Sequence, residues 1–164
     1  MNGCAMRRVV VVGTSGSGKS TLARQLSAAL RVPHIELDQL HWEPNWTPTP
    51  VERLRVKVRH AIAAAGEGWI VCGHYRNVAD EIWPKADTIV WLDYPMSLVG
   101  RRVFLRTMRR WWRHEELWNG NRERLFTQFF TPDSLFLWVI NTWRIRQRDY
   151  PKEFREPFCG HRRV

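Results

Sequence analysis

The sequence of 164 residues lacks the features that mark an exported or membrane-spanning protein. No apolar run approaches the length of a membrane span, and no signal-peptide segment precedes the first run of β-branched residues. The three cysteines, Cys4, Cys72 and Cys159, are odd in number and spaced like neither a zinc site nor a disulfide framework. We therefore expect reduced thiols in a cytoplasmic protein with one domain over residues 1–164.

Acidic residues are also scarce. The sequence has 16 of them and 26 lysines and arginines, so its formal net charge is +10. Such an excess is typical either of a nucleic-acid-binding protein or of a site that holds several phosphate groups. Tryptophans lie in and after the segment in which the arginines gather, and arginine beside aromatic rings can stack on bases or form a basic helix with an apolar back face. The arginines of this segment are Arg101, Arg102, Arg106, Arg109, Arg110 and Arg113.

The most informative segment is a glycine-rich stretch between four valines and a helix-forming run. Its pattern, G-x-x-x-x-G-K-S, is the Walker A motif, in which glycines let backbone N–H groups turn toward phosphate oxygens. In this motif Lys19 reaches the β- and γ-phosphates and the Ser20 hydroxyl ligates Mg²⁺. The sequence therefore predicts a site for a nucleoside triphosphate with magnesium. The candidate nucleotide-binding residues are Gly13, Thr14, Ser15, Gly16, Ser17, Gly18, Lys19, Ser20 and Thr21.

Short apolar segments alternate with helical segments along the chain. This alternation is typical of an α/β protein whose parallel sheet has helices on both faces and binds ligands at the carboxyl ends of its strands. Residues 38–46 and 114–121 are expected to be loops, and residues 49–52 have the pattern of a capping box that starts a helix. The expected strands are about 8–12, 34–37, 69–72 and 88–92, and the expected helices are about 19–30, 50–65, 78–83, 97–113 and 131–148.

Charged residues stand directly after the predicted strands, where they would converge on the glycine-rich loop. Asp93 follows the fourth strand in a Walker B arrangement, which makes it a Mg²⁺ ligand together with Ser20 or, alternatively, an ordinary aspartate that closes a strand. Asp38 closes the second strand and is a candidate base for the hydroxyl of an acceptor, or else a cap for the next turn. Arg76 is a candidate clamp for an acceptor phosphate or carboxylate, or else a solvated surface arginine.

Arginines recur every four residues in the predicted helix 97–113, so Arg102, Arg106 and Arg110 share one of its faces. Arginines so placed in a phosphoryl-transfer enzyme neutralise charge on the transferring group. Arg106 and Arg110 are therefore catalytic candidates, and Arg102 is a substrate-contacting candidate. A solvated basic face is the alternative. Apolar residues are expected largely on the other face: Val99, Val103, Met108, Trp111 and Trp112.

Five blocks, at 13–21, 36–42, 69–76, 86–95 and 115–123, resemble the adenylate-kinase-like P-loop proteins of the topology-modulation type, in the nucleoside-monophosphate-kinase and shikimate-kinase group. The resemblance covers about residues 7 to 150. It implies a three-layer P-loop NTPase fold with strand order 2-3-1-4-5 and an Arg-rich helical lid, inserted at about 97–131. It also implies a role for each matching position. Lys19, Ser20 and Asp93 would bind the nucleotide and the metal, and Asp38 and Arg76 would face the acceptor. The residues of the lid would be Arg102, Arg106, Arg110 and Arg122.

The sequence departs from this family pattern at two places. Cys72 stands where the family usually has an aspartate at the end of the third strand, which removes a carboxylate near the acceptor. Residues 160–164 stand where a fifth strand would begin. We therefore expect that strand to be truncated or only begun, the sheet to have the order 2-3-1-4 with an exposed edge, and base specificity to be weak.

These features predict an ATP- and Mg²⁺-dependent phosphotransferase that moves the γ-phosphate to a small acceptor such as a nucleotide or nucleoside. No membrane partner is expected. The alternative is a nucleotide-binding protein that acts on nucleic acid or as a regulatory switch without turnover, although the sequence contains no nucleic-acid-binding motif. The predicted catalytic residues are Lys19, Asp38, Arg106 and Arg110.

Overall fold

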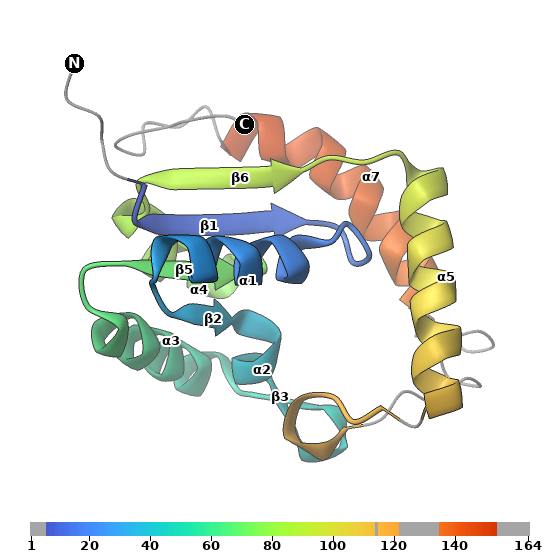
Figure 1. The fold of residues 1–164 in the computed structure, drawn as a ribbon, viewed down its shortest axis with the longest axis horizontal. Helices are drawn as coiled ribbons and strands as arrows, with labels where there is room; N and C mark the ends of the chain where they lie inside the picture. The colour runs from blue at the N-terminus through green and yellow to red at the C-terminus, as the bar shows by residue number, and fades with distance from the viewer. Residues whose placement is uncertain (1–5, 114, 122–134, 154–164) are drawn as a thin grey trace.

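The computed structural model describes residues 6–113, 115–121 and 135–153, and its centre is a four-stranded parallel sheet (Figure 1). The strands lie in the order β2-β5-β1-β6, which is 2-3-1-4 when they are counted along the chain, so the predicted order is confirmed. Residues 154–164, where a fifth strand was expected to begin, lie outside the described residues. The four strands are β1 (Arg8–Gly13), β2 (His34–Glu36), β5 (Trp69–Cys72) and β6 (Thr88–Leu92).

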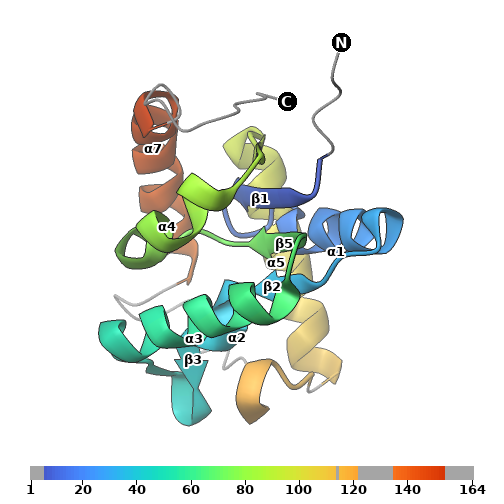
Figure 2. The same ribbon diagram turned by 90° about the vertical axis from the view of Figure 1, so that its left-hand side faces the viewer.

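Helices cover both faces of the sheet, as predicted, because β1 is apolar on both of its sides (Figure 2). Side chains alternate across a strand, so Val9 and Val11 pack toward α1 (Lys19–Leu30), whereas Val10 and Val12 pack toward α3 (Val51–Ala65) and α4 (Arg76–Ile82). All four valines are fully buried. The strand is thereby fixed in the middle of the molecule, and the glycine-rich loop follows from its carboxyl end.

The arginine-rich helix α5 (Met96–Arg113) lies across the carboxyl end of the sheet, beside α7 (Leu135–Glu153) (Figure 1). Its buried stripe is Val99, Val103 and Thr107, and the two valines pack on Val139 of α7. The expectation that Trp111 and Trp112 lie on the apolar face is wrong, because they are 46% and 79% exposed. With 3.6 residues per turn, Trp112 points roughly 180° away from Val103.

Residues 38–46 were expected to form a simple loop, and this expectation is wrong. They form a helical turn, α2 (Leu37–His41), and then a small antiparallel pair of strands, β3 (Trp42–Glu43) and β4 (Thr47–Pro48), joined by the 3₁₀ turn η1 (Pro44–Trp46). The predicted capping box is also wrong. The Thr49 hydroxyl donates to the Leu40 carbonyl at 3.1 Å, because the backbone pairs Thr49 with α2, and Pro50 stands at the start of α3 without a side-chain cap.

Two further 3₁₀ turns complete the described elements, η2 (Trp83–Lys85) before β6 and η3 (Trp118–Gly120) after α5. The described helices include none that is long and apolar enough to cross a membrane. The predicted start of the last helix near residue 131 lies outside the described residues, as do residues 114 and 122–131 of the predicted lid. The extent of that lid stays a prediction.

Candidate functional site

The glycine-rich loop is held in the conformation that its sequence predicts. Gly16 and Gly18 have φ values of +85° and +93°, in the left-handed region that favours glycine, and the Ser17 N–H donates to the Thr14 carbonyl at 3.0 Å. A Cβ on Gly16 would lie 2.5 Å from Cγ2 of Val103 on α5. Gly16 is therefore needed both for the turn and for the close approach of α5. Gly18 caps α1, so the positive end of that helix faces the loop.

Three arginines contact this loop from two helices that follow it far along the chain. Arg106 donates to Ser15 Oγ at 3.0 Å, and Arg102 donates to the Ser17 carbonyl at 3.4 Å. Arg146 of α7 donates to the Gly13 carbonyl at 3.4 Å. Arg102 and Arg106 thus lie where the sequence predicted. Arg146 was missed, because no helical face or motif distinguishes it from the other arginines of α7.

Two further lid arginines were predicted. Arg110 is mostly buried, with its Nε 3.6 Å from a carboxylate oxygen of Glu115. Arg122 lies outside the described residues. Among the lid candidates in the described part of the chain, Arg102 and Arg106 donate hydrogen bonds to the phosphate loop.

The first residues of α1 meet the end of β2. Ser20 Oγ donates to Glu36 Oε1 at 3.4 Å and lies 3.5 Å from Cys72 Sγ. Burial and the charge of Asp38 raise the pKa of Glu36 above its usual range, and the charge of Lys19 opposes that shift. Glu36 was missed as a ligand, although it stands only two residues before Asp38.

Asp93, the predicted partner of Ser20, accepts a hydrogen bond from Gln147 Nε2 on α7. A hydroxyl and a carboxylate are ligands that Mg²⁺ favours, so the Ser20–Glu36 pair offers a second candidate for that ion. The assignment of Asp93 to the metal stays a prediction.

Asp38 lies on α2 and accepts a hydrogen bond from the Tyr75 hydroxyl at 2.6 Å. Burial and the neighbouring Asp38 carboxylate hold the pKa of Tyr75 above its usual range, so the phenol stays a donor. The Tyr75 ring lies 4.5 Å from the His41 ring, measured between centroids. Arg76, the predicted acceptor clamp, is 67% exposed and pairs with Asp149 of α7 at 2.9 Å.

Aromatic rings extend from His41 to the β3–β4 hairpin and η3. The centroid of Trp42 lies 4.7 Å from that of His41, and Trp46 lies 5.6 Å from Trp42 and 6.4 Å from Trp118. We call Trp42, Trp46 and Trp118 the tryptophan wall. Segments that are more than 70 residues apart in the sequence therefore meet in this wall.

Asparagine side chains hold the two parts of the tryptophan wall together. Asn121 is buried, accepts from the Trp46 N–H at 2.8 Å and donates to the Glu43 carbonyl at 3.0 Å. Asn119 donates to the Gln39 carbonyl at 3.4 Å and to the Trp42 carbonyl. The predicted loop 114–121 is thus docked on α2 and the β3–β4 hairpin.

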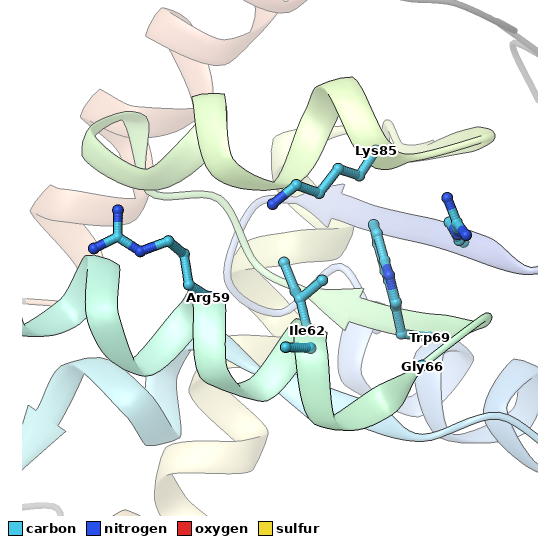
Figure 3. A pocket seen from close by; sticks show the side chains of 7 residues that line it. Arg59, Ile62, Gly66, Trp69 and Lys85 are labelled. Atoms are coloured by element: carbon cyan, nitrogen blue, oxygen red, sulfur yellow. The ribbon is translucent and has the colours of Figure 1, made fainter.

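A hollow of about 240 Å³ lies at the opposite end of the sheet, near the amino ends of β1 and β5 (Figure 3). Three of its lining residues are basic: Arg8, Arg59 and Lys85. Arg8 pairs with Glu67 at 3.3 Å, and Arg59 pairs with Glu81 at 3.0 Å. Because the protein's own carboxylates pair with these arginines, we take the loop end of the sheet as the candidate site.

No family model matches the chain. The uncharacterized protein YqaC of Bacillus subtilis (strain 168) is 26% identical over 130 residues, which are 79% of this chain and 72% of that protein.

Solved structures agree in fold. A gluconokinase from Sinorhizobium meliloti 1021 is 21% identical with a TM-score of 0.54, over 97% of this chain and 83% of that one. A shikimate kinase from Acinetobacter baumannii in complex with shikimate is 13% identical with a TM-score of 0.57, over 98% and 83% of the two chains. The chain therefore has the α/β P-loop fold shared by shikimate kinase and gluconokinase.

Proposed function

We propose that this protein is an ATP-dependent phosphotransferase that acts on a small hydroxylated acceptor. The observation that carries the proposal is the approach of arginines from α5 and α7 to a Walker A loop at the edge of the sheet where β2 leads to Asp38. The charges of Lys19 in that loop and of Asp38 both act on the pKa of Glu36, which lies between them in the fold. The shared fold with shikimate kinase and gluconokinase supports the same reaction class.

The phosphates of ATP would lie along the loop, where backbone N–H groups, Lys19 and the start of α1 provide positive charge. Arg102, Arg106 and Arg146 would add charge-assisted hydrogen bonds to oxygens of the transferring phosphoryl group. Mg²⁺, held through Ser20 with Glu36 or Asp93, would neutralise charge on the β- and γ-phosphates.

Asp38 is the proposed general base. The acceptor hydroxyl oxygen forms a bond to the γ-phosphorus, the bond between that phosphorus and the bridging oxygen of ADP breaks, and the hydroxyl proton passes to the Asp38 carboxylate. The hydrogen bond from Tyr75 fixes one oxygen of this carboxylate, so its orientation is set before the acceptor arrives.

The acceptor is proposed to lie between Asp38 and the tryptophan wall. Gluconokinase and shikimate kinase share the fold, so sugar acids and cyclic hydroxy acids are the first class of acceptor to test. Nucleosides and nucleotides are the second class. The alternative of nucleic-acid binding drew on the arginines of α5. Two of these, Arg102 and Arg106, contact the protein's own loop, which supports the phosphotransferase proposal.

The test is phosphoryl transfer from radiolabelled ATP with Mg²⁺ to a panel of hydroxy acids, sugar acids, nucleosides and nucleotides. Lys19→Ala should lower product formation roughly 10²–10³-fold, as expected for the loss of a preorganised cation at the developing charge. Lys85→Ala is the matched control, because that lysine lines the hollow at the other end of the sheet and should leave the rate unchanged. Equal labelling by the Lys19→Ala variant, or ATP binding without transfer to any acceptor, would contradict the proposal.

A further inference from the structure

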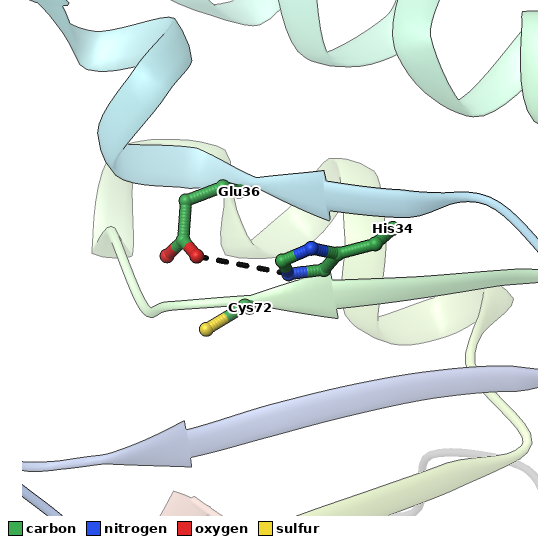
Figure 4. A group of neighbouring side chains, drawn as sticks. All are labelled: His34, Glu36 and Cys72. Atoms are coloured by element: carbon green, nitrogen blue, oxygen red, sulfur yellow. Dashed lines mark ion pairs between the residues drawn. The ribbon is translucent and has the colours of Figure 1, made fainter. Parts of the chain in front are cut away.

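Three potential metal ligands gather between β2 and β5, beside the phosphate loop (Figure 4). Because side chains alternate along a strand, His34 and Glu36 project from the same side of β2. Cys72 stands opposite Glu36 in the register of β5 and belongs to the cluster packed under α1. His34 Nε2 lies 3.7 Å from Glu36 Oε2, and the three ligand atoms all lie within 4.8 Å of one another.

The histidine in this cluster has an unsatisfied atom. Its Nε2 is buried and has no hydrogen-bond partner among the described residues. Burial, and next the charge of Arg24, lower the pKa of His34, which favours the neutral imidazole that a metal ion needs as a ligand. An unsatisfied buried nitrogen is costly, and a bound cation would satisfy it.

We propose that His34, Glu36 and Cys72 form a binding site for a thiophilic divalent cation such as Zn²⁺. Tetrahedral Zn²⁺ with ligands at about 2.0–2.3 Å places ligand atoms about 3.3–3.8 Å apart, which the cluster reaches with small side-chain movements. A mixed set of imidazole, carboxylate and thiolate suits Zn²⁺ and not Mg²⁺, which prefers oxygen ligands. Three protein ligands leave the fourth position to water or to the neighbouring Ser20 hydroxyl.

Occupancy of this site changes the protonation of Cys72. Burial raises the pKa of the Cys72 thiol to about 12, and the Glu36 carboxylate adds to that shift, so the sulfur carries a proton at neutral pH. The cation takes the sulfur lone pair and the thiol proton leaves to the solvent, so one proton is released for each cation bound. Cys72 is fully buried, whereas the side chains of His34 and Glu36 are 19% and 11% exposed.

The site also shares a ligand with the phosphate loop. Glu36 faces Ser20 through Oε1 and His34 through Oε2. A cation bound between His34 and Cys72 draws this carboxylate away from Ser20. If the protein is the phosphotransferase proposed above, Zn²⁺ should therefore inhibit turnover, and this consequence alone depends on that function.

The experiment is a Co²⁺ titration of the full chain in a Cys4→Ser, Cys159→Ser background, in which Cys72 is the only thiol. Cobalt reports its ligands through its spectrum, independently of any catalytic activity. We expect one equivalent to give a thiolate-to-cobalt charge-transfer band in the near ultraviolet, which Zn²⁺ bleaches and excess Mg²⁺ does not. Cys72→Ser should abolish the band, and His34→Gln should weaken affinity at least as much as loss of an outer-shell partner does, roughly 10–100-fold.

The matched control is His60→Gln, because His60 is exposed on α3 and should leave the titration unchanged. The absence of the band in the parent protein would overturn the proposal, and so would its persistence in Cys72→Ser. If circular dichroism shows that Cys72→Ser does not fold, His34→Gln becomes the deciding variant, because His34 is partly exposed. An unchanged Co²⁺ affinity in His34→Gln would then reject the site. A cobalt band without inhibition of turnover by Zn²⁺ would keep the site and reject only its link to the proposed reaction.

Discussion

The two halves of the candidate site are built in different ways. The nucleotide half is one continuous segment, residues 13–21, whose conformation follows from its own glycines. The acceptor half combines Asp38 on α2, Tyr75 before α4 and the tryptophan wall, which joins the β3–β4 hairpin to η3. A continuous motif carries its geometry locally, whereas an assembled surface needs the rest of the fold. A substitution in one half should therefore leave the other half largely intact.

Asp38→Asn is expected to give the largest difference in effect between the two halves of the site. Loss of the general base should lower kcat by about 10²–10⁴-fold, while the dissociation constant of ATP stays unchanged because the loop is untouched. Both are measured by steady-state kinetics and calorimetric ATP titration. Asp80→Asn is the control, since Asp80 is exposed on α4 and its partner is Arg55. Full turnover in Asp38→Asn would remove the base assignment.

Arg146→Ala should instead impair both halves of the site. Its guanidinium donates to the Gly13 carbonyl, and its charge adds to burial in lowering the pKa of His74, which follows β5 on the acceptor side. A hydrogen bond to a charged group contributes about 1.5–3 kcal/mol, so ATP affinity and kcat/KM for the acceptor should both fall roughly 10–100-fold.

Arg144→Ala serves as the comparison for this variant, because Arg144 is exposed two residues earlier on the same helix. A defect confined to one substrate would show that Arg146 belongs to that half of the site alone.

The smallest effect is expected from Asn121→Ala. Its amide links the two parts of the tryptophan wall, so the variant should raise the acceptor KM several-fold without changing ATP affinity. The free energy of unfolding should fall by about 1–3 kcal/mol, because Trp46 N–H and the Glu43 carbonyl lose a partner. Urea unfolding measures that loss, with exposed Asn141→Ala as the reference. An altered ATP affinity would show that the tryptophan wall also affects nucleotide binding at the phosphate loop.

The sequence predicted those parts of the molecule that depend on local pattern. The four valines of β1 are buried on both sides, as a run that predicts a central strand requires. The alternation of strands and helices predicts a parallel sheet, and the family resemblance implied its strand order. Arg102 and Arg106 both contact the loop from one helix, and their spacing had placed them on one face of it. Their catalytic and substrate-contacting roles stay predictions.

Features that depend on tertiary contacts were not predictable in the same way. A proline and several aromatic residues gave 38–46 the composition of a loop, yet hydrogen bonds from Asn119 and Asn121 meet this segment where it forms α2 and the start of a hairpin. Glu36 is close to Ser20 only because β2 and α1 pack on β5. Arg146 reaches Gly13 across 133 positions, and no local spacing encodes such a contact.

The central position of β1 also has a consequence for the order in which the protein can form. Val10 pairs with Val71 and with Ile89, so neither neighbour of β1 exists until a long stretch of further chain has been synthesised. Such non-local parallel pairings are slow to form, and a strand waiting for them is open to wrong partners. On the ribosome, the segment that carries the phosphate loop therefore emerges before both of the strands that complete its native surroundings.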